Sequence, residues 1–128
     1  MESIKTKKDI LEIVKFNKKI SLLSFSESLK EIMKAKNKTT KELAIDSGVT
    51  SMTISRYLNN KRKPSKLSFI ELCEALDIDN LTILKLMINA GISFIPNEEN
   101  DEILFYILIN LQNINKKIIK NILKSYKK

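Results

Sequence analysis

The chain of 128 residues contains no histidine and a single cysteine, Cys73. Without histidine, a Ser-His-Asp triad and general acid-base chemistry by an imidazole are excluded. One cysteine allows neither an internal disulfide nor a zinc site of cysteines and histidines. Cys73 lies in an apolar helical pattern, so we interpret it as a small buried hydrophobic residue. We therefore expect no enzyme activity, no metal and no cofactor.

Glycine and proline are also scarce, with two of each. Turns must then be few and short, which favours an all-α fold over a β sandwich. The longest apolar run, Ile103–Ile109, is far shorter than the about 20 residues of a membrane-spanning helix. The first residues show no signal-peptide pattern. These features predict a cytoplasmic protein with no membrane partner.

The net charge of +8 indicates a polyanionic partner, either nucleic acid or a membrane surface. A lysine-rich composition that merely reflects AT-rich codons is the alternative. The charge is concentrated, because no acidic residue lies between Ser47 and Ile70. That stretch contains both arginines of the chain, Arg56 and Arg62, together with Lys61, Lys63 and Lys66.

Polar residues in front of apolar repeats predict where helices begin. Ser24 with Glu27, and Thr39 with Glu42, have the spacing of a capping box, in which each residue satisfies a backbone N–H of the other. Thr50, Ser65 and Asp79 are single N-caps. The predicted helices span residues 25–36, 40–47, 51–58, 66–76 and 80–90, and the last one is expected to bury Leu81, Leu84, Met87 and Ile88.

The two ends of the chain give weaker patterns. Residues 1–23 are a basic N-terminal extension, which forms either a short amphipathic helix or a partly disordered arm. Residues 98–126 predict one last helix with acidic residues at its start and lysines at its end, as the helix dipole favours. Its seam, at spacings of 3 and 4, is Leu104, Ile107, Leu111, Ile114 and Ile118. We expect this seam to form a homodimer, and the alternative is that it folds back onto its own domain.

The stretch TTKELAIDSGVTSMTISRYLNNKRKPS, residues 39–65, resembles the helix-turn-helix of phage repressors of the Cro/CI or xenobiotic-response-element type. The matching residues are Glu42-Leu43-Ala44, Gly48-Val49-Thr50, Thr53-Ile54-Ser55-Arg56 and Pro64-Ser65. The resemblance covers about residues 25–90. It implies an all-α, five-helix lambda-repressor-like DNA-binding domain over residues 24–92, followed by a C-terminal oligomerisation helix.

The resemblance also implies a role for each residue of the motif. The residues that would read bases are Ser51, Met52, Ser55 and Arg56, and Arg56 would pair with guanine. The residues that would bind DNA phosphates are Thr39, Thr40, Lys41, Asn59, Lys61, Arg62 and Lys63. The alternatives are a Met52 side chain at the edge of the core, an Arg56 paired with Glu42 or Asp46, and a basic turn that is merely solvated.

The sequence thus predicts a sequence-specific regulator of transcription, a repressor that reads an operator in double-stranded DNA as a dimer. A regulatory protein is a possible further partner. The first alternative is an antitoxin or a plasmid or phage accessory protein with the same DNA-binding head. The others are a recombinase, for which the chain is too short, and a membrane-surface protein with basic amphipathic ends.

Overall fold

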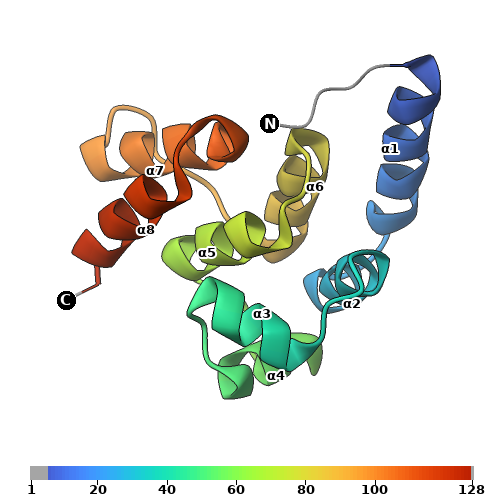
Figure 1. Cartoon of the computed structure of the whole chain (residues 1–128), viewed down its shortest axis with the longest axis horizontal. Coiled ribbons are helices and arrows are strands. Elements are labelled where there is room, and N and C mark those ends of the chain that lie inside the picture. Colours follow the sequence, from blue (N-terminus) through green and yellow to red (C-terminus); the bar gives the residue numbers. More distant parts are fainter. Residues whose placement is uncertain (1–5, 128) are drawn as a thin grey trace.

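The computed structural model describes residues 6–127, and these residues form helices and connecting turns without a β-strand (Figure 1). The elements are α1 (Lys7–Ile20), α2 (Phe25–Ala35), α3 (Thr40–Ser47), α4 (Ser51–Leu58), α5 (Lys66–Leu76), α6 (Asn80–Ala90), α7 (Glu99–Ile109), a 3-10 turn η1 (Leu111–Asn113) and α8 (Lys116–Ser125). The all-α prediction is therefore confirmed. None of these helices within residues 6–127 is long and apolar enough to cross a membrane.

The helices of the middle of the chain begin where the capping residues predict. The Thr39 hydroxyl accepts the Glu42 N–H at 3.1 Å, and the Glu42 carboxylate accepts the Thr39 N–H at 2.9 Å. Ser24 and Glu27 form the same reciprocal pair at the start of α2. The single N-caps Thr50, Ser65 and Asp79 each accept, through the side chain, the backbone N–H of the residue three positions later. Each cap satisfies a donor that the first turn of a helix leaves unpaired.

Helices α2 to α6 share one apolar core. Leu29, Ile54, Phe69, Leu72 and Leu86 are fully buried in it. Such complete burial stabilises the folded state by about 1.5–3 kcal/mol per large aliphatic or aromatic side chain. This arrangement is the lambda-repressor-like domain that the resemblance implies.

The predicted buried stripe of α6 is wrong in part. Leu84 and Ile88 are exposed, whereas Ile83 and Leu86 are buried. Helix α6 contacts α1, α2 and α7. Because three neighbours surround it and its sequence is apolar on most sides, the pattern alone does not define which face is buried.

The described part of the basic N-terminal extension is a helix and not a disordered arm. Helix α1 packs against α6, and Ile20 is fully buried. The side-chain amide of Asn17 donates to the hydroxyl of Thr82 on α6 at 3.1 Å. Helix α1 therefore belongs to the packed domain, and residues 1–5 lie outside the described residues.

The prediction of one continuous helix over residues 98–126 is wrong, because the chain turns between α7 and α8. Asparagine side chains replace the helical hydrogen bonds at this turn. The Asn110 amide donates to the carbonyl of Tyr106 at 2.9 Å, and Asn115 accepts the N–H of Lys117 at 2.8 Å. Asparagine competes with the helical backbone in this way and favours caps and turns.

The turn also breaks up the predicted dimerisation seam. Leu104, Ile107 and Leu111 are buried within the chain, Ile114 is half-buried and Ile118 is exposed. The five residues therefore do not form one exposed stripe, and most of them pack on the domain itself.

Candidate nucleic-acid interface

A tight turn, Gly48-Val49-Thr50, sets α4 across α3. Gly48 has φ of 80°, a left-handed conformation that glycine adopts without strain. The Val49 side chain is buried, and its N–H donates to the Ser47 hydroxyl at 3.0 Å. The turn is thus fixed by an apolar anchor and by a short polar contact.

The inner face of α4 is held by α2. Ile54 and Tyr57 are buried, and the Tyr57 ring meets Phe25 edge to face, with centroids 6.0 Å apart. The Ser26 hydroxyl donates to the carbonyl of Leu58 at the last turn of α4, at 2.5 Å. These contacts fix the orientation of α4 while its other face stays in solvent.

The predicted base-reading residues all lie on that exposed face. Ser51, Met52, Ser55 and Arg56 are exposed, and Met52 exposes 65% of its surface. The interpretation of Met52 as a core residue is therefore wrong. The Ser55 hydroxyl is 3.4 Å from the side-chain nitrogen of Asn59, which can donate to it.

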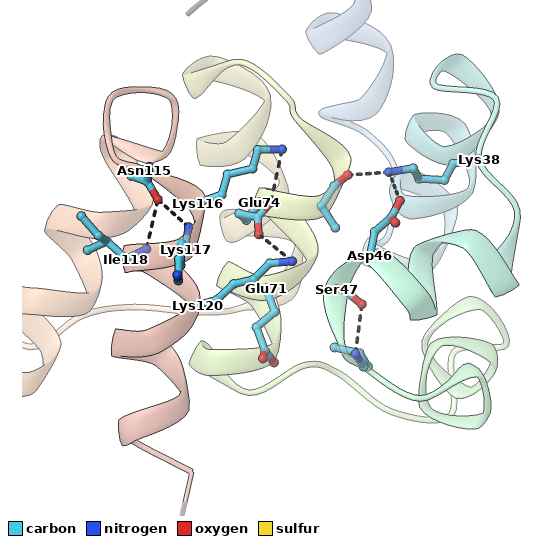
Figure 2. Close-up of polar contacts among 12 residues, drawn as sticks. Lys38, Asp46, Ser47, Glu71, Glu74, Asn115, Lys116, Lys117, Ile118 and Lys120 are labelled. Carbon is cyan, nitrogen blue, oxygen red and sulfur yellow. Dashed lines mark hydrogen bonds and ion pairs between the residues drawn. The ribbon is translucent and has the colours of Figure 1, made fainter.

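Arg56 is unpaired, because the two acidic residues of α3 have other partners. Glu42 is engaged in the cap with Thr39, and Asp46 pairs with Lys38 at 2.7 Å (Figure 2). Within the described residues 6–127, Arg56 takes part in no ion pair. The alternative in which Arg56 pairs with Glu42 or Asp46 is thus wrong, and its guanidinium is available for a ligand.

The contacts of these two carboxylates also keep them charged. The backbone N–H and hydroxyl of Thr39 lower the pKa of Glu42, and the hydrogen bond from Lys38 lowers the pKa of Asp46. Both groups are therefore ionised at neutral pH. Glu42 caps α3 and Asp46 pairs with Lys38, so within residues 6–127 neither carboxylate forms an ion pair with Arg56 on the exposed face of α4.

The predicted phosphate-binding residues lie in two groups, one on each side of α4 in the chain. One group is at the start of α3 and the other is in the turn that follows α4. Thr39, Lys41, Asn59, Lys61, Arg62 and Lys63 are exposed, and Thr40 is half-buried. Asn60 adopts φ of 57°, which turns the chain sharply after α4, and Pro64 is buried behind the turn.

Lys66 belongs to the same basic stretch of sequence but points elsewhere. Its ammonium pairs with the Asp101 carboxylate of α7 at 2.7 Å and lies 5.7 Å from the centre of the Phe94 ring. This lysine therefore fastens α7 to the start of α5 and is not part of the exposed basic surface.

Comparison with protein families matches residues 29–79, less than half of the chain, to the model described as helix-turn-helix. This segment is similar to the helix-turn-helix family, and it contains the two short helices α3 and α4 joined by a tight turn. The match confirms the resemblance to the Cro/CI and xenobiotic-response-element type, and it supports DNA-binding regulation of transcription as the general function. Comparisons with curated proteins and with solved structures gave no match.

The helix-turn-helix domain and its neighbours offer no metal site within the described residues, where no three His, Cys, Asp or Glu side chains gather to hold an ion. Cys73 is buried, and burial raises the pKa of its thiol. The thiol therefore stays protonated and acts as the small apolar residue that the sequence predicts.

Sequence reasoning missed the position of the lysines at the end of the chain. It placed Lys116 and Lys120 near the end of one long helix, but they belong to the first half of α8 and approach α5 (Figure 2). Lys116 lies 3.6 Å and Lys120 lies 4.0 Å from the carboxylate of Glu74. The spacing of four residues showed that both lysines share a helix face, but no signal in the sequence indicated which helix this face meets.

Proposed function

We propose that this protein is a sequence-specific repressor of transcription that inserts α4 into the major groove of an operator. The observation that carries the proposal is Arg56, which is exposed and unpaired on the outer face of α4. Arginine recognises guanine through two parallel hydrogen bonds, and each such pair contributes about 1–3 kcal/mol of discrimination. The exposed Met52 side chain, one turn earlier, suits an apolar contact with a thymine methyl group.

The basic residues on either side of α4 support the same placement. The start of α3, with Lys41 exposed, and the turn Lys61–Lys63 would bind the two phosphate backbones that border the groove. Contacts of this kind position the protein and make binding depend on salt, whereas α4 supplies the sequence preference. Repression follows if the bound protein covers a promoter and excludes polymerase.

The test is fluorescence anisotropy with a set of short duplexes that includes DNA upstream of the protein's own gene. Arg56→Ala is compared with Arg62→Ala, which removes the same side chain from the basic turn. We expect Arg56→Ala to lose roughly 5- to 150-fold in affinity for the preferred duplex with little change in salt slope. Arg62→Ala should weaken binding to all duplexes and reduce the salt slope by about 0.9.

Two results decide the proposal. Tight binding to a subset of duplexes, lost in Arg56→Ala alone, supports an operator reader. Weak and equally salt-dependent binding of both variants to every duplex contradicts it. Repression itself is measured by transcription in vitro from a promoter that carries the preferred duplex, and an unchanged or raised transcript level contradicts the repressor role.

We further propose that the protein acts as a homodimer through the groove between α7 and α8. Ile103, Tyr106, Ile114 and Ile122 line this groove, and Tyr106 exposes 63% of its surface. Ile118, from the predicted seam, is also exposed on α8. A two-fold dimer would place two copies of this apolar surface together and would present two copies of α4 to the two halves of an operator.

Charge complementarity favours a second copy as the occupant of the groove. The α7 side carries the exposed acids Glu99 and Glu102, and the α8 side carries the exposed Lys117. None of these three residues takes part in an ion pair within residues 6–127. In a two-fold arrangement that sets α7 of one copy against α8 of the other, Lys117 of each copy would face the two acids of its partner.

Light scattering behind size exclusion tests the dimer. We expect Tyr106→Asp to convert a dimer to a monomer, because a carboxylate buried in an apolar interface is destabilising. Ile88→Asp is the control, since Ile88 is exposed on α6 and lies outside the groove. A wild-type monomer at all concentrations would contradict the homodimer, and it would favour a regulatory protein as the partner of this face.

A further inference from the structure

We infer that α8 is a second DNA-binding element, whose lysines bind the phosphate backbone beside the segment that α4 reads. The inference rests on the proposed function and extends it to a helix outside the matched segment 29–79.

The lysines of α8 form one basic face. Lys116, Lys120 and Lys124 are spaced four residues apart, and Lys127 follows one residue after the helix-end residue Tyr126. Residues four apart are neighbours on the surface of a helix. Such a row of positive charges suits a nucleic-acid backbone, which presents a line of negatively charged phosphates.

Ion pairs fix the direction in which this row runs. At one end of α8, Lys116 approaches Glu74, in the last turns of α5, at 3.6 Å. At the other end, Lys127 pairs with Glu71, nearer the start of α5, at 2.6 Å. The residues that follow α8 therefore contact α5 at a point nearer its start than the first turn of α8 does.

This direction brings the basic row toward the DNA-binding turn. Helix α5 begins at Lys66, directly after the turn Lys61–Lys63 and the buried Pro64. In Figure 1, α8 runs down past the end of α5 where that helix begins, and the chain ends to the left of α3. The row therefore runs toward the start of α5, which follows the turn Lys61–Lys63 in the chain.

The flank of α3 supports this placement. The pKa of Asp46, on α3, is lowered mainly by its hydrogen bond with Lys38, and the positive charges of Lys120 and Lys116 contribute as well. The positive charges of these two lysines thus act on the Asp46 carboxylate, after the larger effect of Lys38. Helix α8 packs against α5, and α5 in turn packs against α3.

Two acids, Glu71 and Glu74, face the four lysines of the row, so the row keeps a net positive charge. Lys124 makes no ion pair within residues 6–127, and the side chains of Lys116 and Lys120 remain 67% and 59% exposed beside Glu74. Lys127 is 45% exposed although it is paired with Glu71. An ammonium group has three donors, so a lysine that holds one carboxylate oxygen can also donate to a phosphate.

The apolar side of α8 argues for DNA and against a membrane as the polyanion. Ile119 and Leu123 are buried in the protein core. An amphipathic helix binds a membrane by inserting its apolar face into the lipid. These two side chains are packed inside the protein and are therefore not exposed for insertion. The exposed basic face suits the rigid line of phosphates in a duplex.

The experiment compares the preferred duplex, trimmed to the segment that α4 protects, with the same duplex extended on both sides by about ten base pairs, one helical turn. We expect the full chain to bind the extended duplex more tightly and with a steeper salt dependence, by about 0.9 for each added phosphate contact. Lys124→Ala should reduce the affinity gained from the extended duplex by roughly 1.5- to 5-fold, which is the contribution of one exposed ion pair. The double variant with Lys127→Ala should reduce it further.

Three further variants isolate the cause. Glu71→Gln removes the same ion pair as Lys127→Ala but keeps the lysine, so it should retain or increase the gain from the extended duplex. Lys15→Ala with Lys18→Ala removes the same charge from the exposed side of α1 and should leave the gain unchanged. Lys124→Ala alone breaks no internal contact, so it tests the inference even if the double variant unfolds.

Equal binding of the two duplexes by the full chain would overturn the inference, as would a double variant that is folded and keeps the gain. Either result would leave the operator proposal intact, because that proposal depends on the effect of Arg56→Ala on the trimmed duplex. Conversely, a chain that shows no preference among trimmed duplexes contradicts the proposed function, whatever α8 does.

Discussion

Asn17 of α1 donates a hydrogen bond to the Thr82 hydroxyl of α6 at 3.1 Å, and this hydroxyl donates to the Asp79 carboxylate at 2.6 Å. Asn17 and Thr82 are buried, so the pair links the two helices through a dry contact. Asp79 also accepts the N–H of Thr82 and caps α6. The chain that precedes the helix-turn-helix domain is thus joined to it by a specific polar contact as well as by apolar packing.

We expect Asn17→Ala to lower the free energy of unfolding by about 1–3 kcal/mol, because a buried hydrogen bond is lost and Thr82 is left with an unused acceptor. Urea unfolding followed by circular dichroism measures the change. Lys18→Ala, at the exposed neighbouring position, is the control and should change stability by less than about 0.5 kcal/mol. An Asn17 variant as stable as this control would show that α1 is held by apolar contacts alone.

Asp101 of α7 should make stability depend on pH. Its carboxylate accepts hydrogen bonds from the Lys66 ammonium at 2.7 Å and from the Ile95 N–H at 2.8 Å. The contact with Lys66, followed by that with Ile95, lowers the pKa of Asp101 in the folded chain. The carboxylate therefore stabilises the fold fully above its unfolded pKa of about 3.9, and this stabilisation is lost as the pH falls through the lower folded value.

Thermal unfolding of the wild type and of Asp101→Asn between pH 7 and pH 3 measures this effect. We expect the wild type to have the higher Tm at pH 5 to 7 and the two Tm values to converge toward pH 3. The control is Glu12→Gln, which removes an exposed carboxylate of α1 that takes part in no ion pair within residues 6–127. A Tm difference for Asp101→Asn that is independent of pH would show that packing, and not the charge, links α7 to α5.

The sequence predicted the helix-turn-helix domain well because its signals are local. Thr39 and Glu42 satisfy each other three residues apart, and Gly48 and Asn60 adopt the left-handed conformations that their positions favour. The helical spacing also predicted the exposed face of α4, because burying Ile54 on the inner face leaves Arg56 on the outer face, in solvent. The base-reading and phosphate-binding roles themselves remain predictions.

The C-terminal region was predicted poorly because its structure depends on distant partners. The spacing of the seam from Leu104 to Ile118 predicts one helix. In the structure, the Asn110 side chain caps the end of α7 and the Asn115 side chain caps the start of α8. Lys116 then lies at the start of α8, where the helix dipole disfavours a cation, and Glu74 of α5 compensates it. No pattern within residues 98–126 identifies a partner on α5.

Alanine variants at two glycine turns can distinguish an effect on folding stability from an effect on DNA binding. Gly48 has φ of 80° and Gly91 has φ of 69°, and at both positions an added Cβ would meet no atom within 4 Å. Alanine at either position is therefore strained only in its backbone, which costs roughly 1–2 kcal/mol. We expect Gly48→Ala and Gly91→Ala to lower the free energy of unfolding by similar amounts in urea titrations.

Only Gly48→Ala should also weaken binding to the preferred duplex, because relaxation of the strained turn rotates α4 away from its contacts with the groove. Anisotropy titrations are made at a temperature where both variants are fully folded, so that lost stability does not mimic lost affinity. Gly48→Asn should restore much of both properties, since asparagine tolerates the left-handed conformation better than alanine. Equal affinities for Gly48→Ala and Gly91→Ala would mean that the orientation of α4 is set by its contacts with α2, such as the bond from Ser26 to Leu58, and not by the turn.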